Sequence, residues 1–335
     1  MEEPLFSVIM PTYQRANMIG SAIETLLRQT CRDFECLIVD DGSTDDTGQA
    51  LAGLTLPEKF RYFKLDHIGN MACRNFGIEQ ARGRWITYLD SDDFWLPERL
   101  EEFRQAIERR PEVGFWFSNA FTYRFGRILE RVFDPGGPIP EGKIPGHFAV
   151  GAEFLPYITT NIAIPRKVFK EYGLYRKDMV ILDNELYARM FDGGVQVGVI
   201  RKPLAIRRIH DEQVTHYWLE EFPEALAALE AGLPSKEIFE RERRKLVYEF
   251  ALYLIKALQP KKARRFMREQ LGTGAYASRL YWYGLTPVPL LRQLRRLHKF
   301  YLLVRHWPVL APVDFRQAHK FVQALIDKEP SPSKN

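Results

Sequence analysis

Short hydrophobic runs alternate with segments of helical periodicity over the first 110 residues of the chain. Apolar and β-branched residues fill the runs at 5–10, 34–39, 61–65 and 85–89, and turn-forming residues follow several of them. Apolar side chains recur at helical spacing in 19–27 and 70–81, and Pro97 suits the first turn of another helix. Such alternation is typical of βαβ units, so we predict a mostly parallel sheet flanked by helices.

The pattern changes twice further along the chain. Residues 113–123 form a long aromatic strand that we expect to pair with 127–133, and residues 134–151 contain four prolines and five glycines, which favours a loop. We predict a strand at 161–164, helices from 165 and over 183–191, and a strand over 195–209. Only helical periodicity remains beyond residue 218. The sequence therefore predicts an α/β domain over 1–218 and a helical region over 219–335.

The composition is that of a folded globular protein. The 335 residues are 46% hydrophobic, 13% aromatic and 27% charged, which argues against disordered, collagen-like and membrane-bundle classes. No run approaches the roughly 18 apolar residues of a membrane span, and the first residues lack the pattern of a signal peptide. Three cysteines without metal-ligand spacing fit a reducing compartment. We therefore expect a cytoplasmic protein.

Charge is distributed unevenly along the chain. The first 100 residues contain 10 basic and 16 acidic side chains, whereas residues 219–335 contain 21 basic and 12 acidic ones. The acidic beginning suggests a bound cation near the N-terminal site. The basic end suggests an acidic surface as its partner, such as phospholipid or nucleic acid.

Two of the strongest predicted strands end in acidic clusters. Asp40 and Asp41 follow the run at 34–39, and Asp90, Asp92 and Asp93 follow the run at 85–89. In an open parallel sheet these strand ends lie at one edge, where ligands bind. Clustered carboxylates repel one another unless a cation balances them, and oxygen ligands favour Mg²⁺ or Mn²⁺. The alternative is that these residues are ordinary helix caps and turn formers.

Three segments together resemble family 2 glycosyltransferases of the GT-A fold group. They read FSVIMPTYQRANMI, FECLIVDDGSTDDT and GNMACRNFGIEQARGRWITYLDSDD, in the order and spacing of that family. The resemblance covers about residues 5–210 and implies nothing firm for the C-terminal region. It implies a GT-A nucleotide-diphospho-sugar transferase that moves a sugar from a nucleotide diphosphate with inversion.

The resemblance assigns donor binding to residues in all three segments. The first loop would lie against the base and ribose, Asp41 with its neighbour would accept a hydrogen bond from the base, and Arg74 would reach the base or phosphate. A carboxylate facing an imide N–H is the expected way to read uracil, so UDP is favoured. The implied donor-binding residues are Pro11, Thr12, Tyr13, Arg15, Asp40, Asp41, Arg74, Asp90 and Asp92.

The resemblance also implies a metal and a general base. Asp92, Asp93 and the downstream His210 would bind Mn²⁺ or Mg²⁺ on the diphosphate. Asp183 matches the base that deprotonates the acceptor hydroxyl, although Leu182 stands where the family has glutamate. The alternatives are a helix cap for Asp183 and a hydrogen-bonded structural role for His210.

The C-terminal region contains a basic amphipathic segment. Residues 287–306 place leucines on one helical face and most of the arginines elsewhere. Such a helix either packs in a small bundle or lies on an anionic membrane, which would suit a lipid-linked acceptor. A peripheral contact with the inner membrane face is therefore a hypothesis.

The expected partners are a nucleotide-sugar donor and a glycan or lipid-linked acceptor, and no nucleic acid. Cell-surface glycan or glycolipid synthesis is the favoured role. The chain lacks a glutamine-x-x-arginine-tryptophan motif, so a single addition is favoured over processive synthesis. The rival interpretations are a sugar-1-phosphate nucleotidyltransferase and a catalytically silent sugar-nucleotide-binding or scaffold protein.

Overall fold

The computed structural model divides the chain into two compact units. It describes residues 3–124, 126–145, 155–176, 184–210, 222–223, 226, 236–256, 258–305 and 313–329. Unit 1 comprises Met1–His147, Leu155–Asp211 and Pro312–Asn335, and unit 2 comprises Phe148–Phe154 and Glu212–Ala311. The last residues thus return to unit 1, whereas the sequence placed everything beyond 218 in one helical region. The reason is that the final helix buries its apolar face in unit 1.

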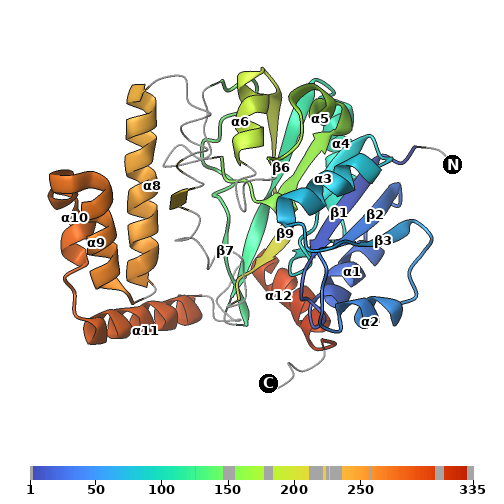
Figure 1. Cartoon of the computed structure of the whole chain (residues 1–335). Coiled ribbons are helices and arrows are strands. Elements are labelled where there is room, and N and C mark those ends of the chain that lie inside the picture. The colour runs from blue at the N-terminus through green and yellow to red at the C-terminus, as the bar shows by residue number, and fades with distance from the viewer. Residues whose placement is uncertain are drawn as a thin grey trace. The chain divides into compact units, whose positions relative to one another are not determined.

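Unit 1 is built on one sheet of nine strands among the described residues (Figure 1). Its order is β3-β2-β1-β4-β8-β6-β9-β5, with β7 beside β6. The strands are β1 Phe6–Thr12, β2 Phe34–Asp40, β3 Phe60–Lys64, β4 Trp85–Tyr88, β5 Phe94–Trp95, β6 Val113–Arg124, β7 Arg127–Arg131, β8 Ile162–Pro165 and β9 Gln196–Arg208.

The sheet is mixed. Parallel pairs join β1 to β2 and β4, β2 to β3, and β6 to β9. Antiparallel pairs join β8 to β4 and β6, β7 to β6, and β5 to β9. The predicted parallel βαβ region is therefore β1–β4, and the short antiparallel strand β8 connects it to the second half of the sheet.

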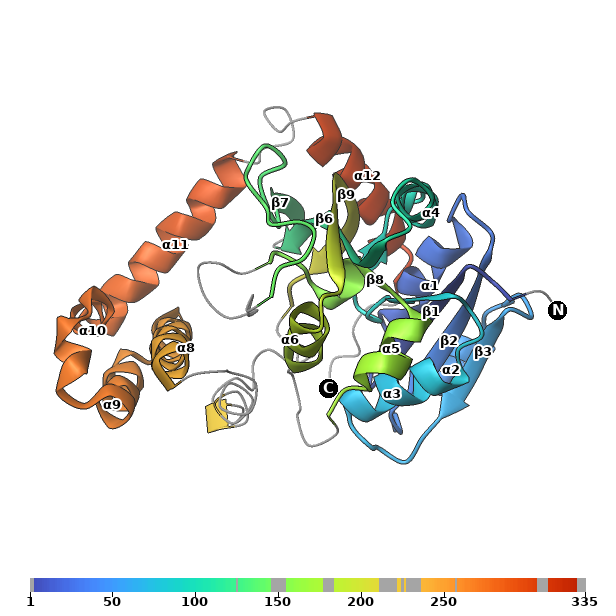
Figure 2. The same ribbon diagram turned by 90° about the horizontal axis from the view of Figure 1, so that it is seen from above.

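Helices cover both sides of this sheet. In the view from above, α4 and α5 lie on opposite sides (Figure 2). Gly77 of α3 approaches Ile9 of β1 so closely that a Cβ on the glycine would lie 2.5 Å from the Ile9 side chain. The helices of unit 1 are α1 Ile19–Leu27, α2 Thr47–Ala52, α3 Asn70–Gln80, α4 Arg99–Arg109, α5 Arg166–Tyr172, α6 Asn184–Asp192 and α12 Val313–Ile326, with a 3₁₀ turn at Thr159–Asn161.

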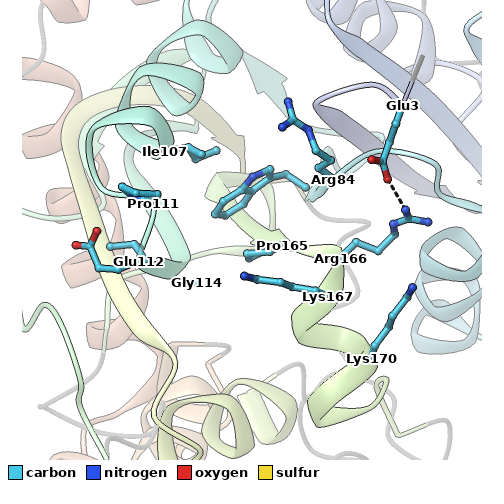
Figure 3. Close-up of a pocket in the computed structure, with 12 residues that line it drawn as sticks. Glu3, Arg84, Ile107, Pro111, Glu112, Gly114, Pro165, Arg166, Lys167 and Lys170 are labelled. Atoms are coloured by element: carbon cyan, nitrogen blue, oxygen red, sulfur yellow. Dashed lines mark hydrogen bonds and ion pairs between the residues drawn. The ribbon is translucent and has the colours of Figure 1, made fainter. Parts of the chain in front are cut away.

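A cavity of about 410 Å³ opens at the edge of the sheet where β4 and β6 begin (Figure 3). Arg84, Arg166 and Lys170 line it together with Glu3, which pairs with Arg166 at 2.6 Å. This edge is opposite the strand ends that carry the acidic clusters. The cavity is therefore not the predicted donor site.

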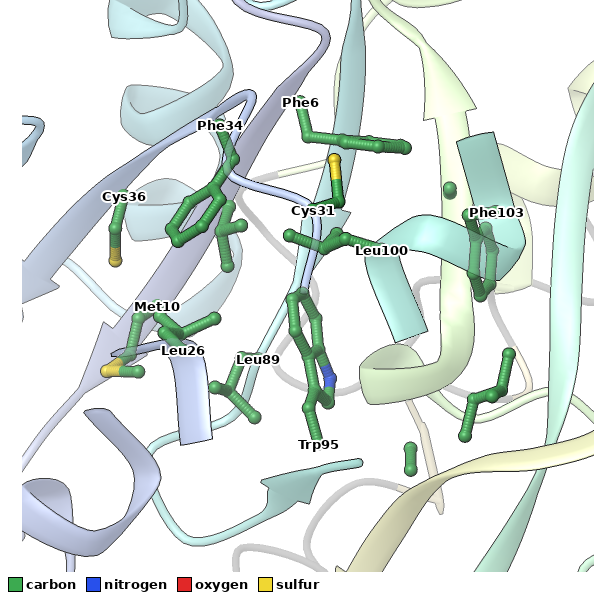
Figure 4. Packing of buried hydrophobic residues seen from close by; sticks show 14 of the residues in the cluster. Phe6, Met10, Leu26, Cys31, Phe34, Cys36, Leu89, Trp95, Leu100 and Phe103 are labelled. Carbon is green, nitrogen blue, oxygen red and sulfur yellow. The ribbon is translucent and has the colours of Figure 1, made fainter. Parts of the chain in front are cut away.

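The core of unit 1 lies between the sheet and the helices α1 and α4. Phe6 and Met10 of β1 pack with Leu26 of α1, Trp95 of β5 and Leu100 of α4, all fully buried (Figure 4). Because strand side chains alternate, Phe6, Val8 and Met10 share this face of β1. Phe115, Trp116 and Phe117 of β6 are also buried, each at most 3% exposed.

Unit 2 is helical in its described residues. Phe250 of α8 contacts Phe222 and Phe266 with ring centroids 5.0 and 6.2 Å away, and Val247 and Met267 are fully buried. Its helices are α8 Lys236–Lys256, α9 Pro260–Leu271, α10 Arg279–Tyr283 and α11 Val288–Arg305, with a 3₁₀ segment at Gly272–Ala277. No helix in the described part of the chain is long and apolar enough to cross a membrane.

Candidate functional site

The loop after β1 is held against the loop after β2. Gln14, with φ of +53°, donates its backbone N–H to the Ser43 hydroxyl at 2.9 Å. Its side-chain oxygen accepts the backbone N–H groups of Thr44 and Asp45 at 3.0 and 2.9 Å. The two predicted segments therefore form one surface at the carboxyl ends of β1 and β2.

The predicted base-binding residues of this first loop differ in exposure. Thr12 is buried at the end of β1, and its hydroxyl has no hydrogen-bond partner among the described residues. Tyr13 is 42% exposed and stacks on His67, with ring centroids 4.5 Å apart. Pro11 pairs with Val39 of β2 in the parallel ladder. An exposed aromatic face with a buried hydroxyl nearby suits a planar base and a polar group of the nucleotide.

Asp40 is fully buried and both of its carboxylate oxygens accept hydrogen bonds within the protein. Oδ1 accepts the backbone N–H of Ser43 at 2.8 Å, and Oδ2 accepts the Tyr62 hydroxyl at 2.7 Å. Burial and this hydrogen bond raise the pKa of Tyr62 well above its usual value. In the structure Asp40 holds the turn after β2.

Asp41 holds the segment that leads into α3. Its Oδ1 accepts the backbone N–H groups of Ile68 and Gly69 at 2.6 and 3.1 Å, and Oδ2 lies 3.2 Å from Nδ1 of His67. Gly69 has φ of +91°, a conformation that favours glycine. Asp41 therefore fixes both the start of α3 and the ring on which Tyr13 stacks.

Arg74 extends from α3 toward the end of β4. Its Nη2 lies 3.4 Å from Oδ1 of Asp90, and its guanidinium lies 5.6 Å from the ring centre of Tyr88. Arg74 is 4% exposed, whereas the Asp90 side chain is 31% exposed. The predicted arginine and the first carboxylate of the second cluster are thus brought together.

Asp92 lies between two side chains from distant parts of the chain. Its Oδ2 is 3.0 Å from Nε2 of His210, just beyond β9, and 3.6 Å from Nε of Arg15 in the first loop. Burial alone would raise the pKa of Asp92, but the hydrogen bond with His210 and the charge of Arg15 outweigh it and lower the pKa. Asp92 is therefore ionised at neutral pH.

Asp93, the next residue along the chain, is buried. Its Oδ1 accepts the backbone N–H of Arg208 at 2.9 Å. Burial first, and then the negative charges of Asp92 and Asp90, raise the pKa of Asp93 well above its usual value. A carboxylate in this position is unfavourable unless a positive group compensates it.

The donor set around Asp92 fits a divalent ion that also binds a diphosphate. No group of three or more His, Cys, Asp or Glu residues in the described ranges could hold an ion by itself. Asp92 and His210 offer one oxygen and one nitrogen ligand on the same side of the site. Mg²⁺ and Mn²⁺ are commonly held by one or two protein ligands with phosphate oxygens and water in the remaining positions.

The predicted base, Asp183, lies outside the described residues, and the helix α6 begins directly after it. Glu185 in the first turn of α6 pairs with Arg189, Nε to Oε1, at 2.7 Å. Arg189 also donates to the backbone oxygens of Leu174, at 2.9 Å, and Tyr172. The first turn of α6 is therefore tied to the end of α5.

A further contact joins α3, the helix that carries Arg74, to the segment between α5 and α6. Asn75 of α3 donates to the backbone oxygen of Tyr175 at 2.8 Å and accepts the backbone N–H of Tyr175 at 3.0 Å. The Tyr175 hydroxyl lies 3.0 and 2.8 Å from those of Tyr88 and Tyr187. Sequence reasoning did not find these contacts, because they join residues as much as 100 positions apart.

Comparison with known proteins identifies relatives for this arrangement. Residues 7–173 match the family model described as glycosyl transferase family 2. A protein of Rickettsia felis described as an uncharacterized glycosyltransferase is 44% identical over 141 residues, which are 40% of this chain and 23% of that protein. The match thus spans about a quarter of the length of that relative.

The names of one further relative and one solved structure state which molecules those proteins bind or act on. The Escherichia coli UDP-Glc:alpha-D-GlcNAc-diphosphoundecaprenol beta-1,3-glucosyltransferase WfgD is 30% identical over 120 residues, 36% of this chain and 47% of that protein. The structure of a Pyrobaculum calidifontis mannosyltransferase in complex with GDP-Man and Mn²⁺ superimposes with a TM-score of 0.53 at 18% identity, over 98% of this chain and 89% of that one. The likeness confirms the predicted GT-A fold with its helical C-terminal region.

Proposed function

Because the chain belongs to glycosyl transferase family 2 through residues 7–173, we propose that it transfers one sugar from a UDP-sugar to an acceptor hydroxyl with inversion. The observation that carries this proposal is the Asp92–His210–Arg15 group at the carboxyl edge of the sheet. It joins a carboxylate, an imidazole and a guanidinium from three separate segments. The carboxylate and imidazole suit a divalent ion, and the guanidinium suits a phosphate oxygen.

The nucleotide would lie on the surface formed by the loops after β1 and β2. Tyr13 supplies an exposed aromatic face on which the base would stack. Asp41 would accept the imide N–H of uracil, in place of the His67 ring that now lies 3.2 Å from its Oδ2. The UDP-Glc donor in the name of the E. coli relative supports this choice.

Asp92 and His210 would hold Mn²⁺ or Mg²⁺ against the diphosphate, with Arg15 beside them. When bound, the ion acts as a Lewis acid that neutralises charge developing on the departing nucleotide. Arg74, which lies beside Asp90, would add positive charge near the ribose and phosphates. The protein thereby orients the donor and compensates the charge on the leaving group.

Asp183 would remove the proton from the acceptor hydroxyl as the new glycosidic bond forms. It directly precedes α6, whose first turn is fixed by the Glu185–Arg189 pair. A carboxylate on the acceptor side, opposite the leaving UDP, is what a single displacement with inversion requires.

A turnover assay tests this function. The protein, Mn²⁺ and each of a panel of nucleotide sugars are incubated with glycan and lipid-linked acceptors, and UDP release is followed. Replacement Asp183→Asn should lower turnover by about 100- to 10,000-fold, the range for loss of a general base, while UDP binding measured by calorimetry is retained.

The matched control is Asp192→Asn, the same replacement at the other end of α6, which should keep wild-type turnover. Full activity of Asp183→Asn would remove the assigned base. Binding of nucleotide sugar by the wild-type protein with no release under any acceptor would favour the silent binding module, for which Leu182 is the supporting feature.

We further propose a lipid-linked acceptor and a peripheral contact with an anionic membrane through α11. Leu290, Leu294 and Leu297 share one face of this helix and are 46%, 40% and 63% exposed, and Arg292 and Arg296 are exposed elsewhere on it. This is the pattern of a helix that lies in a membrane interface. Absence of binding to anionic vesicles at low salt in a co-sedimentation assay would rule the contact out.

A further inference from the structure

A buried ion pair joins the end of β9 to the end of the described chain. Nη1 of Arg208 lies 2.5 Å from Oε1 of Glu329, and Nη2 lies 3.1 Å from Oε2. The two side chains are 10% and 14% exposed. The Ser21 hydroxyl of α1 donates to the same carboxylate. This bidentate geometry is the strong and directional form of a charged hydrogen bond.

The segment that carries Glu329 is fixed to unit 1 along its length. At its start Asp314 pairs with Arg131 of β7, and Phe315 contacts Phe121 of β6 with ring centroids 5.0 Å apart. After the helix Lys328 pairs with Glu24 of α1 at 2.6 Å. The apolar residues Phe315, Ala318, Val322 and Leu325 are at most 5% exposed. Glu329, three residues beyond the end of α12, therefore follows a helix that is packed closely on unit 1.

Arg208 also contacts Asp93, the last residue of the second acidic cluster. Its backbone N–H is donated to Asp93 at 2.9 Å, and its guanidinium lies 4.9 Å from the ring centre of Phe94. Ile209, the next residue, donates its backbone N–H to the backbone oxygen of Tyr123 at 2.9 Å. His210, which meets Asp92, comes directly after it. The position of His210 thus depends on how firmly the end of β9 is held.

We propose that Glu329 is a positioning residue for the metal and diphosphate site. It holds Arg208, and through Arg208 the end of β9, so that His210 stays within reach of Asp92. This inference rests on the proposed function, because it assigns Asp92 and His210 to the ion. Supporting residues behind metal ligands commonly change metal affinity by about 10- to 100-fold when they are replaced.

The test is the affinity of the protein for Mn²⁺ in the presence of UDP, measured by calorimetry. Glu329→Gln keeps the shape of the side chain but removes the charge that pairs with Arg208. It should weaken Mn²⁺ binding about 10-fold, at the lower end of that range because Glu329 does not touch His210 itself. The KM for the donor should rise more than kcat falls.

The matched control is Asp327→Asn, an exposed carboxylate two positions earlier that accepts a hydrogen bond from Gln323 at 2.7 Å. It should leave Mn²⁺ affinity unchanged. Equal affinities in the Glu329→Gln and Asp327→Asn variants would overturn the inference. A wild-type protein that binds neither Mn²⁺ nor UDP would instead refute the proposed function.

A double variant covers the case in which Glu329→Gln does not fold, since removing one charge of a largely buried ion pair is costly. Arg208→Met with Glu329→Leu replaces the pair by apolar side chains of similar size, which often preserves folding. Weakened Mn²⁺ binding in this folded variant supports positioning by the pair. Wild-type Mn²⁺ affinity would show that the pair only stabilises the fold and would overturn the inference.

Discussion

The two acidic clusters lie at the same edge of the sheet but have different partners. The carboxylates of Asp40 and Asp41 are held largely by backbone N–H groups of nearby loops, with Tyr62 and His67 added. The Asp92 carboxylate instead faces His210 and Arg15, whose side chains come from other segments. Backbone partners fix a carboxylate in one place, whereas side-chain partners can rearrange around an ion or a phosphate. Asp40 and Asp41 therefore mainly hold their loops, with Asp41 also proposed to meet the base, whereas Asp92 is available to an ion.

Replacement of Asp92 should have the largest effect. Asp92→Asn removes the charge that would hold the ion, and a Lewis acid on a leaving phosphate is worth several kcal/mol, so we expect transfer to fall by about 1000-fold or more. Calorimetry should show weaker binding of UDP with Mn²⁺ in the same variant. Asp66→Asn, an exposed replacement near the first cluster, is the control and should retain activity.

Replacement of Asp40 should change stability more than catalysis. Asp40→Asn removes the buried charge that accepts from the Ser43 N–H and replaces the acceptor of the Tyr62 hydroxyl by an NH₂ donor, at a cost of about 1–3 kcal/mol. Denaturant unfolding should report this loss, with Mn²⁺ affinity close to wild type once the variant is folded. The comparison between the clusters would fail if Asp40→Asn lost Mn²⁺ affinity as severely as Asp92→Asn.

Replacement of Asp93 should give the smallest effect, and one of opposite sign. Because the folded protein raises the pKa of Asp93, its ionisation destabilises the metal-free fold as pH rises above the usual aspartate value of about 4. Asp93→Asn can still accept from Arg208 and should raise the melting temperature of the metal-free protein by a few degrees at pH 7.

The pH dependence provides the check on that prediction. The gain from Asp93→Asn should vanish below about pH 4, where the aspartate is protonated in both the folded and the unfolded chain. Saturating Mn²⁺ and UDP should also reduce the gain, because positive charge then compensates the wild-type carboxylate. A variant that is less stable than wild type at pH 7 would contradict the assignment.

The local pattern of hydrophobic residues was sufficient to predict most of the strands and the position of the acidic clusters at their ends. The hydrophobic runs at 34–39 and 85–89 correspond to β2 and β4, and Asp40 and Asp90 lie at or just beyond their ends. The two-residue strand β5 was too short to leave a pattern. The antiparallel direction of β8 depends on pairing with distant strands, which no periodicity of its four residues encodes.

The partners of the site residues could not be found in this way. A sequence motif identifies Asp92 and suggests His210, but it does not show that Arg15 completes the group or that Asp40 bonds to Tyr62. The Arg208–Glu329 pair joins residues 121 positions apart, and neither residue belongs to a recognisable motif. Such contacts follow from tertiary packing alone.

The return of α12 to unit 1 changes how deletion experiments should be designed. A stop codon anywhere within 212–311 would remove unit 2 residues together with a helix that unit 1 needs, so a dead protein would say nothing about unit 2 itself. The informative deletion excises that internal segment and rejoins the flanking chain through a flexible tether. In the same way, replacing residues 212–311 by the corresponding segment of a homologue would exchange most of unit 2 and keep His210 and the other residues proposed to bind the donor.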